Sequence, residues 1–507
     1  SDSEICLLLY WSVKEPIMRA EMTGESDMVT VDEWLATIKG LLNVDMAENT
    51  IALKNKLEEF RVKTLVRDST VSCGDIVIGH ENGFRDYASH YEKKTPGILK
   101  DLLRIREKRA GNNSLKKEAA KRLFGDVLYG SVTRFEQYVQ CPFAFFAHYG
   151  LLLNERQQYE ISSLDHGNLF HQAMEHLSHE LEQRNKNWQD LSEEEAVLLA
   201  AECVDAVAER YQGRKYFQSN RVSFMLKRLK NEVVHSVWAM WHQMQEGDFV
   251  QTYTEKGFRG NDKEWESMCI PFDEDAKICL NGVIDRVDLC SLPGEELIKI
   301  IDYKSSDSQD LLLAKVYYGL QMQLLTYLEA AKEMVEKEHK GKEAVPAAML
   351  YYAIKEKNLD WKPESEEEYE KRVLDSMKCK GYVNEEPEII GHLDKSVVNG
   401  GELIPGQKSG VVPVAVDKKG LLKKNSGTLS TKDFETLIAH TKEKMKECGK
   451  AILDGKIEAI PYVYEDNDGC TYCPYGSVCG HESKKDGVRE MKKMSDDEVW
   501  EALYGDD

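Results

Sequence analysis

Two acidic residues and a lysine in one short stretch could bind a metal ion and act on a phosphodiester. Residues 281–306 contain Asp285 in one apolar run, with Asp302 and Lys304 at the end of a second. Carboxylate oxygens are the ligands that Mg²⁺ prefers, and a metal ion with a lysine can stabilise charge developing on a phosphate. These residue types predict a Mg²⁺-dependent phosphodiesterase. The alternative is a surface hairpin with solvated charges.

A β-hairpin must bring these three residues together. The apolar runs, residues 282–289 and 297–303, flank a turn at Pro293 and Gly294, which is typical of a hairpin. Residues i and i+2 of a strand share a face, so Asp302 and Lys304 should point the same way.

The segments after the hairpin predict the rest of the core. A helix is predicted over residues 311–336, where Gln323 and Tyr327 share a face, and a buried strand over residues 345–354. Strand, strand, helix and strand in this order predict an α/β fold with a mixed central sheet.

The segments before the hairpin are mostly helical. Helices are predicted over residues 192–211 and 221–245, and over a stretch near residue 171 whose apolar stripe includes His171. A lone histidine on such a stripe is more often a core residue than a ligand. Strands follow at residues 252–258, which contain Glu255, and 267–272. The motif Thr133-x-x-Glu136 fits a capping box at the start of another helix.

The C-terminal region contains Cys470, Cys473 and Cys479, spaced C-x2-C-x5-C in a loop rich in Gly, Pro and Tyr. This spacing predicts a metal centre. Zinc and a 4Fe-4S cluster both take four ligands, so one is missing from the motif. His481 and the distant Cys141 are the two candidates for the fourth position.

Composition narrows the class of protein. The chain has 507 residues, which suggests about three domains, and a formal net charge of −22, which argues against a generic nucleic-acid-binding surface. The twelve cysteines are too sparse for a disulfide scaffold, so thiols or metal ligands are expected. No apolar run is long enough to predict a membrane span. The G-x-x-x-x-G-K-[ST] motif of P-loop ATPases is absent from the sequence.

Taken together, these motifs resemble a known family. The motif SVTRFEQYVQCPFAFF, Gly167 followed by His171, the GVIDRVD and DYK strands, Gln323 with Tyr327, and the terminal cysteines occur in one order over about residues 130–481. The chain resembles the C-terminal half of the AddB (RexB) component of AddAB-type helicase–nucleases. That part carries a RecB-like nuclease domain of the PD-(D/E)XK superfamily, with a restriction-endonuclease-like core.

The resemblance implies roles for the matched positions. His171, Asp285 and Asp302 would bind Mg²⁺, with the Tyr303 carbonyl as a further ligand. Lys304 would orient the attacking water, and Gln323 and Tyr327 would position the site or the DNA backbone. Glu255 is a weaker candidate for an additional acid. The resemblance selects a 4Fe-4S cluster over zinc, held by four cysteines: Cys141, Cys470, Cys473 and Cys479.

The resemblance also implies a biological setting. The protein would be the nuclease subunit of a bacterial, cytoplasmic complex that processes double-strand breaks for recombinational repair. The AddA-type partner would unwind the duplex, and this chain would cut the single strand with the 5′ end. The implied domains are residues 1–125, the end of a helicase-like region or a linker; 126–484, a nuclease closed by the cluster; and 485–507, a tail.

Two other functions compete with this interpretation. A stand-alone iron–sulfur exonuclease of the CRISPR-adaptation type would share the fold, but such proteins are much shorter. A non-catalytic DNA-binding subunit would have a degenerate site, whereas Asp285, Asp302 and Lys304 are all present.

Overall fold

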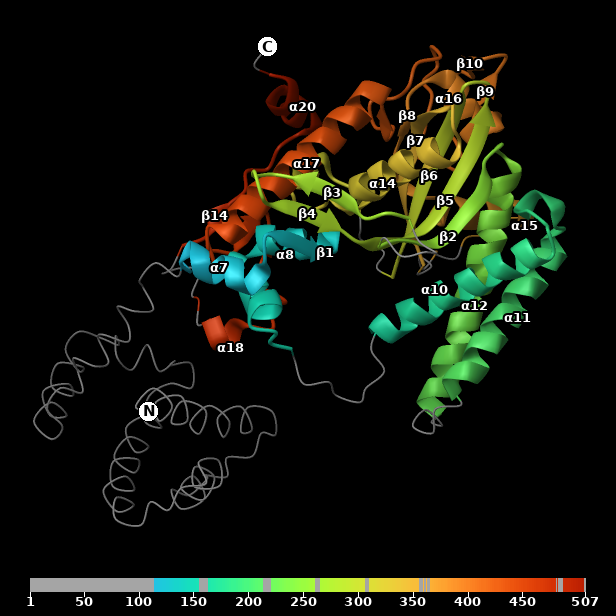
Figure 1. The fold of residues 1–507 in the computed structure, drawn as a ribbon. Helices are drawn as coiled ribbons and strands as arrows, with labels where there is room; N and C mark the ends of the chain where they lie inside the picture. Colours follow the sequence, from blue (N-terminus) through green and yellow to red (C-terminus); the bar gives the residue numbers. More distant parts are fainter. Residues whose placement is uncertain are drawn as a thin grey trace, which may run out of the picture. The chain divides into compact units, whose positions relative to one another are not determined.

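The computed structural model describes residues 114–154, 163–212, 220–259, 265–305, 310–354, 359, 362, 365–479, 481 and 487–505. All of them belong to one compact unit, residues 112–507 (Figure 1). Most of the first predicted domain, up to residue 113, therefore lies outside the described residues.

A mixed sheet forms the centre of this unit. Its six strands have the order β11-β8-β7-β6-β5-β2. Strand β5 pairs antiparallel with β2 and β6, and β6 pairs parallel with β7. These strands are β2 (Val250–Phe258), β5 (Gly282–Leu292), β6 (Glu295–Lys304), β7 (Glu343–Ala353), β8 (Lys380–Asn384) and β11 (Thr428–Leu429). The predicted α/β fold with a mixed sheet is confirmed.

The predicted hairpin is the β5–β6 pair at the centre of this sheet. Leu292 and Glu295 are the last paired residues before the turn, and Gly294 has a φ of 89°. A glycine accepts this left-handed conformation without the penalty that a Cβ atom brings. The turn therefore fixes the register that places Asp285 and Asp302 on neighbouring strands.

Helices cover both faces of the sheet (Figure 1). Helices α10 (Ser163–Gln183), α11 (Glu193–Gln212) and α12 (Asn220–Gln245) share one hydrophobic core with the sheet. Helices α14 (Gln323–Glu338) and α17 (Thr431–Leu453) share the other core. No helix among the described residues is both long enough and apolar enough to cross a membrane.

Smaller elements surround these layers. The helices are α7 (Lys117–Phe124), α8 (Val132–Gln140), α9 (Pro142–Phe145), η1 (Phe146–Gly150), η2 (Trp188–Asp190), α13 (Leu313–Tyr317), α15 (Glu366–Ser376), α16 (Pro387–Leu393), η3 (Lys395–Val397), α18 (Gly476–Cys479) and α20 (Asp496–Tyr504). The strands are β1 (Val127–Gly130), β3 (Met268–Pro271), β4 (Lys277–Leu280), β9 (Val398–Asn399), β10 (Glu402–Leu403), β12 (Tyr462–Tyr464), β13 (Asn467–Asp468) and β14 (Arg489–Glu490).

The prediction of one helix over residues 311–336 was wrong. The segment forms two helices, α13 and α14, separated at Gly319, which has a φ of 78°. A left-handed residue cannot continue a right-handed helix, so the chain turns here. Gln323 therefore lies at the first position of α14 instead of in the middle of a long helix.

The predicted capping box at Thr133 was also wrong. The residue that precedes α8 is Ser131, and its side chain caps no backbone N–H. The Glu136 carboxylate instead accepts hydrogen bonds from the backbone of α14, at Met322 and Gln323. A local motif was overridden here by a long-range contact, which spacing cannot reveal.

The expectation that the cysteines are thiols or metal ligands was wrong for two of them. Cys269 and Cys279 face each other on the antiparallel strands β3 and β4 and form a disulfide. Eight of the described cysteines are free, and they include the four candidate cluster ligands.

Candidate metal-dependent active site

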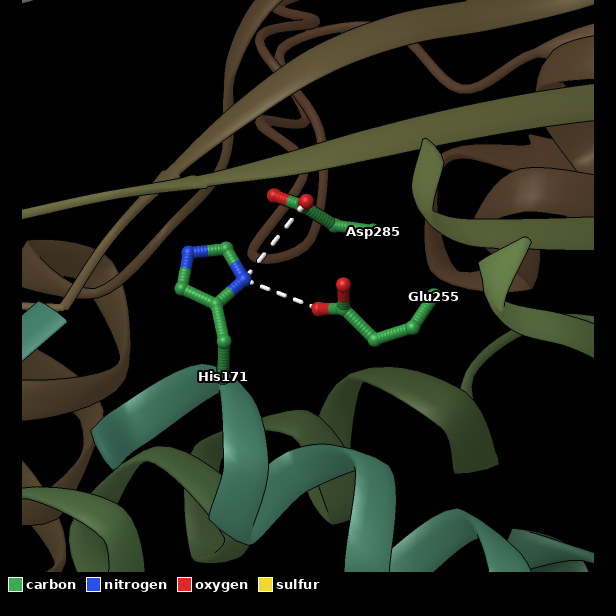
Figure 2. Close-up of side chains that lie close together, drawn as sticks. All are labelled: His171, Glu255 and Asp285. Atoms are coloured by element: carbon green, nitrogen blue, oxygen red, sulfur yellow. Dashed lines mark hydrogen bonds and ion pairs between the residues drawn. The ribbon is translucent and has the colours of Figure 1, made fainter. Parts of the chain in front are cut away.

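Three side chains from three different elements meet beside the central hairpin. His171 projects from α10 toward Glu255 of β2 and Asp285 of β5 (Figure 2). Its Nδ1 atom lies 2.9 Å from Glu255 Oε1 and 3.5 Å from Asp285 Oδ1. One ligand atom from each residue lies within 4.8 Å of the others, which is close enough for all three to bind one metal ion.

Glu255 is held in an unusual backbone conformation. Its φ is 46°, although it lies within β2 and is not a glycine. Such a conformation costs about 1–3 kcal/mol and is concentrated at functional sites. The strand is also irregular between Gln251 and Tyr253, which is typical of a strand that redirects a side chain. The sequence contained no sign of this strain, so Glu255 could be named only as a weak candidate.

The surrounding carboxylates make His171 a cation in the absence of a metal. Burial by itself would lower its pKa, but the hydrogen bond to Glu255 and the charge of Asp285 outweigh burial and raise the pKa of His171 to about 9. The same Nδ1 atom that faces Glu255 and Asp285 would have to lose its proton before it could bind a metal ion. His171 is therefore neither a core histidine nor a solvated one.

Asp302 and Lys304 begin a chain of polar contacts that runs into α14. Lys304 Nζ lies 2.6 Å from Asp302 Oδ2 and donates a 2.9 Å hydrogen bond to Gln323 Oε1. Gln323 Nε2 in turn donates a 2.9 Å hydrogen bond to the hydroxyl of Tyr327. These contacts join four side chains in one network: Asp302, Lys304, Gln323 and Tyr327. Each of the two pairs predicted to share a face is part of it.

Two further residues shape this network. The ring of Tyr351 on β7 lies with its centroid 5.4 Å from Lys304 Nζ, a cation–π contact. A Cβ atom at Gly282 would lie 2.8 Å from the ring of Phe258 and 3.2 Å from that of Tyr327. Glycine at this position of β5 therefore leaves the space that Tyr327 needs to reach Gln323.

The two hairpin acids are buried, and burial disfavours their charge. Asp302 is 2% exposed and Asp285 is 8% exposed. Burial is the main cause that raises the pKa of each, and the charge of Asp302 adds to the rise at Asp285. Asp285 Oδ2 also accepts a 2.7 Å hydrogen bond from the Tyr303 N–H, which fixes the carboxylate. The side chain of Tyr303 packs in the core that the sheet shares with α10, α11 and α12.

The donor set fits a divalent cation. Glu255, Asp285 and Asp302 supply three carboxylates, Lys304 supplies one positive charge, and neutral His171 supplies a nitrogen. Ionised, the group would carry two uncompensated negative charges in a largely buried place, where such charge is costly. A hard divalent cation bound through oxygen would offset it.

The cysteine motif comes together with Cys141, as the long-range alternative requires. Cys141 packs in one small core with Cys473 and Tyr475, and Cys473 and Cys479 are near enough to influence its pKa, which burial raises. The hydroxyl of Tyr475 contacts His148 Nδ1 at 2.7 Å and donates to the Leu153 carbonyl. These contacts fasten the C-terminal loop to the Cys141 segment.

His481, the other candidate for the fourth position, is also close to the motif. Its backbone N–H donates to Cys479 Sγ over 3.3 Å. Both ring nitrogens are buried and have no hydrogen-bond partner within the part of the chain that the structure describes. The region therefore offers five donor side chains for a four-coordinate centre.

Comparison with known proteins agrees with this geometry. Residues 130–480 match the PD-(D/E)XK nuclease superfamily. The chain is 35% identical over 397 residues to a Lachnoclostridium phytofermentans protein named as a subunit of an ATP-dependent helicase/deoxyribonuclease, a match that covers 78% of this chain and 33% of that protein. Proteins of the same name match from Alkaliphilus oremlandii (30% identity; 76% of this chain, 33% of that protein) and Clostridium perfringens (32%; 77% and 34%).

The chain spans about a third of the length of these curated relatives. The family match, in contrast, includes His171, the β5–β6 hairpin, α14 and the cysteine motif. By its fold and by this match, the chain belongs to the PD-(D/E)XK nuclease superfamily.

Proposed function

We propose that this chain is the nuclease subunit of an ATP-dependent helicase–nuclease and hydrolyses DNA with Mg²⁺. The observation that carries the proposal is the meeting of His171, Glu255 and Asp285 beside the Asp302–Lys304 pair. Buried acids around one histidine and one lysine are an arrangement suited to metal-assisted phosphodiester hydrolysis.

Each residue has a separate task in this proposal. His171, Asp285 and Asp302 would hold the metal, with Glu255 as a further ligand and the Tyr303 carbonyl beside Asp285. A bound Mg²⁺ supplies positive charge to the scissile phosphate and lowers the pKa of a water. Lys304, held by Asp302 and Gln323, would orient that water and offset charge on the phosphate.

The other network residues would act on geometry. Gln323 would keep Lys304 in place, and Tyr327 would fix the amide of Gln323 by accepting its second hydrogen bond. The tasks proposed for this set are metal binding and contact with the phosphate backbone, which carries no sequence information, so cleavage would be largely independent of sequence.

The four cysteines would hold a 4Fe-4S cluster with a structural role. Cys141, Cys470, Cys473 and Cys479 come from opposite ends of the nuclease unit, so a cluster would pin those ends together. A cluster supplies metal–thiolate bonds that only the folded chain can complete.

The relatives' name supports the setting of this activity. One subunit of a helicase/deoxyribonuclease implies a partner subunit and a DNA substrate. We place the chain in the bacterial cytoplasm, where its partner would unwind broken DNA ends and this site would cut the 5′-ended strand for recombinational repair. The functional domain would be residues 126–484, preceded by the end of a helicase-like region and followed by a short tail.

The decisive experiment is Asp302→Asn in the purified complex of the full-length chain with its partner. The substitution keeps the shape of the side chain but removes a charge needed for metal binding, so Mg²⁺-dependent DNA cleavage should fall at least about a thousandfold. Asp375→Asn is the matched control, because Asp375 pairs with Lys408 on the surface. Undiminished cleavage by Asp302→Asn would exclude the proposed site.

Strand polarity is tested separately with the same complex. A blunt duplex labelled at one 5′ end and, in a second reaction, at the 3′ end of the same strand reports which strand shortens. Loss of the 5′-ended strand should depend on Asp302, and the 3′-ended strand should persist.

A further inference from the structure

Helix α14 begins inside the candidate site but lacks a cap of its own. The residue before its first turn is Met322, whose side chain makes no capping hydrogen bond. The first N–H groups of any helix have no partner within the helix and must find one elsewhere. At α14 this matters for the site, because the first residue of the helix is Gln323, which holds Lys304.

Glu136 supplies the missing cap from a distant part of the chain. Its Oε1 atom accepts hydrogen bonds from the N–H of Met322 at 2.6 Å and of Gln323 at 3.2 Å. The carboxylate also lies at the positive end of the dipole of a 16-residue helix. Glu136 thus does for α14 what an N-cap side chain does, although α8, which carries it, lies far upstream in sequence.

The surroundings of Glu136 connect it electrostatically with the site. Burial raises its pKa to about 7, against the two backbone hydrogen bonds and the nearby positive charge of Lys304, which lower it. Asp302 is also close enough to act on it, in the opposite direction. Glu136 is therefore buried at a cost in free energy, at a place close to both the start of α14 and the Asp302–Lys304 pair.

We infer that Glu136 is a positioning residue of the candidate nuclease site: by capping α14 it fixes the backbone of Gln323 and, through Gln323, the place of Lys304. It touches neither substrate nor metal. The inference rests on the proposed nuclease function, and it gives the SVTRFEQYVQCP motif a task besides carrying Cys141. Glu136 lies on α8 and Cys141 directly follows that helix. The same helix therefore links the cysteine centre to the candidate nuclease site.

The test measures cleavage kinetics and amide exchange for Glu136→Ala and Glu136→Gln in the full-length chain with its partner. Glu136→Ala should lower kcat about 10- to 100-fold, as expected for a displaced catalytic group, with KM for DNA within about twofold. Amide hydrogens of peptides covering residues 320–328 should exchange about fivefold faster, the loss expected for a helix cap. Glu136→Gln should show smaller changes in both, because its amide oxygen still accepts but carries no charge.

Glu368→Gln is the matched control. Glu368 belongs to the capping box of α15, where it accepts from the Ser365 N–H at 2.9 Å, and no residue of α15 belongs to the site. This variant should leave kcat and the exchange of residues 320–328 unchanged. Peptides from α11, which packs in the core on the other face of the sheet, should exchange at the wild-type rate in every variant.

The outcomes separate this inference from the proposed function. Wild-type kcat and exchange in both Glu136 variants would overturn the inference while leaving the nuclease function intact. A wild-type complex that cuts no DNA would overturn the function, and exchange at residues 320–328 would still decide whether Glu136 caps α14. If Glu136→Ala does not fold, Glu136→Leu decides, because its side chain fills similar space but accepts no hydrogen bond. Wild-type kcat and exchange in that variant would overturn the inference.

Discussion

At the scale of single residues, the site depends on balancing buried charge. Glu255, Asp285 and Asp302 are gathered around His171 and Lys304, and in the metal-free protein the protonated His171 partly offsets them. A divalent ion and the His171 proton would therefore compete for the same place. The strained backbone of Glu255 indicates that its position is maintained despite a conformational cost.

Glu255→Gln should weaken metal binding. The substitution preserves the shape of the side chain but removes one of the three negative carboxylates at the site. The Kd for Mn²⁺, used as a probe for Mg²⁺, should therefore rise roughly tenfold or more. Calorimetric titration checks this. Glu182→Gln is the control and should bind as the wild type does, because the side chain of Glu182 is 82% exposed near the C-terminal end of α10. Equal affinity in both variants would remove Glu255 from the metal site.

Glu136 should give stability a measurable pH dependence. Its pKa rises from 4.5 to about 7 in the folded state because of burial, so the folded protein holds this proton more tightly than the unfolded chain. Stability should then fall as pH rises from about 4.5 to 7, by at most about 3 kcal/mol.

Comparison with Glu136→Gln isolates this contribution, because the glutamine cannot titrate. The melting temperature of the wild type relative to the variant should be higher at pH 5 than at pH 8. A constant difference across this range would show that Glu136 titrates normally. The nearby charges of Lys304 and Asp302 are present in both proteins.

At the scale of elements, the division between α13 and α14 decides where Gln323 lies. Gly319 has a φ of 78°, and a Cβ atom there would lie 3.4 Å from Val139 Cγ2 on α8. The turn places α14 so that its first residue contacts Lys304, while the helix packs on β6 and β7 of the sheet. The same turn brings the start of α14 to Glu136, which also lies on α8.

Gly319→Ala should destabilise the protein and disturb the site. A residue with a Cβ atom costs about 1–2 kcal/mol in this conformation, so the melting temperature should fall by a few degrees. Nuclease activity measured well below that temperature should also fall, because relief of the strain would shift Gln323. Gly410→Ala is the control, since Gly410 has open space around its Cα atom and no positive φ. Full activity in Gly319→Ala would show that the turn tolerates substitution without moving the site.

At the scale of the whole molecule, distant parts of the sequence close on one another around the nuclease core. The Phe143 N–H donates to the Glu458 carbonyl at 3.2 Å, and Arg489 Nε donates to the Ile460 carbonyl at 2.9 Å. A second guanidinium nitrogen of Arg489 donates to the carbonyls at the end of α8. Hydrogen bonds therefore already hold together the two distant segments that carry the four cysteines.

Cys141→Ala should remove the iron–sulfur chromophore. Protein prepared without oxygen should be brown, with iron and sulfide in equal amounts, and loss of one of four thiolate ligands should bleach it and lower its melting temperature. Cys203→Ala is the control, because Cys203 is a buried free thiol of α11. Colourless wild-type protein containing zinc would contradict the cluster. A chromophore that survives Cys141→Ala but not His481→Ala would make His481 the fourth ligand.

The sequence by itself determined the features that follow from local pattern. Alternating apolar residues and a Pro-Gly turn predicted the β5–β6 hairpin, and i to i+2 spacing placed Asp302 and Lys304 on one face. Apolar periodicity predicted α11 and α12 almost to their ends. The close spacing of three cysteines predicts a metal centre, because such spacing is typical of metal ligands, and this stays a prediction.

Only the tertiary structure decided which distant residues meet. Glu255 contacts His171 from a strand whose backbone is strained at that residue. Glu136 caps the start of α14 instead of forming the capping box predicted for its own helix. The disulfide between Cys269 and Cys279 likewise depends on the register of β3 and β4. Spacing along the chain reports faces of one element, whereas these contacts depend on how elements pack. The hairpin acids were therefore identifiable from sequence, but the groups that complete and position their site were not.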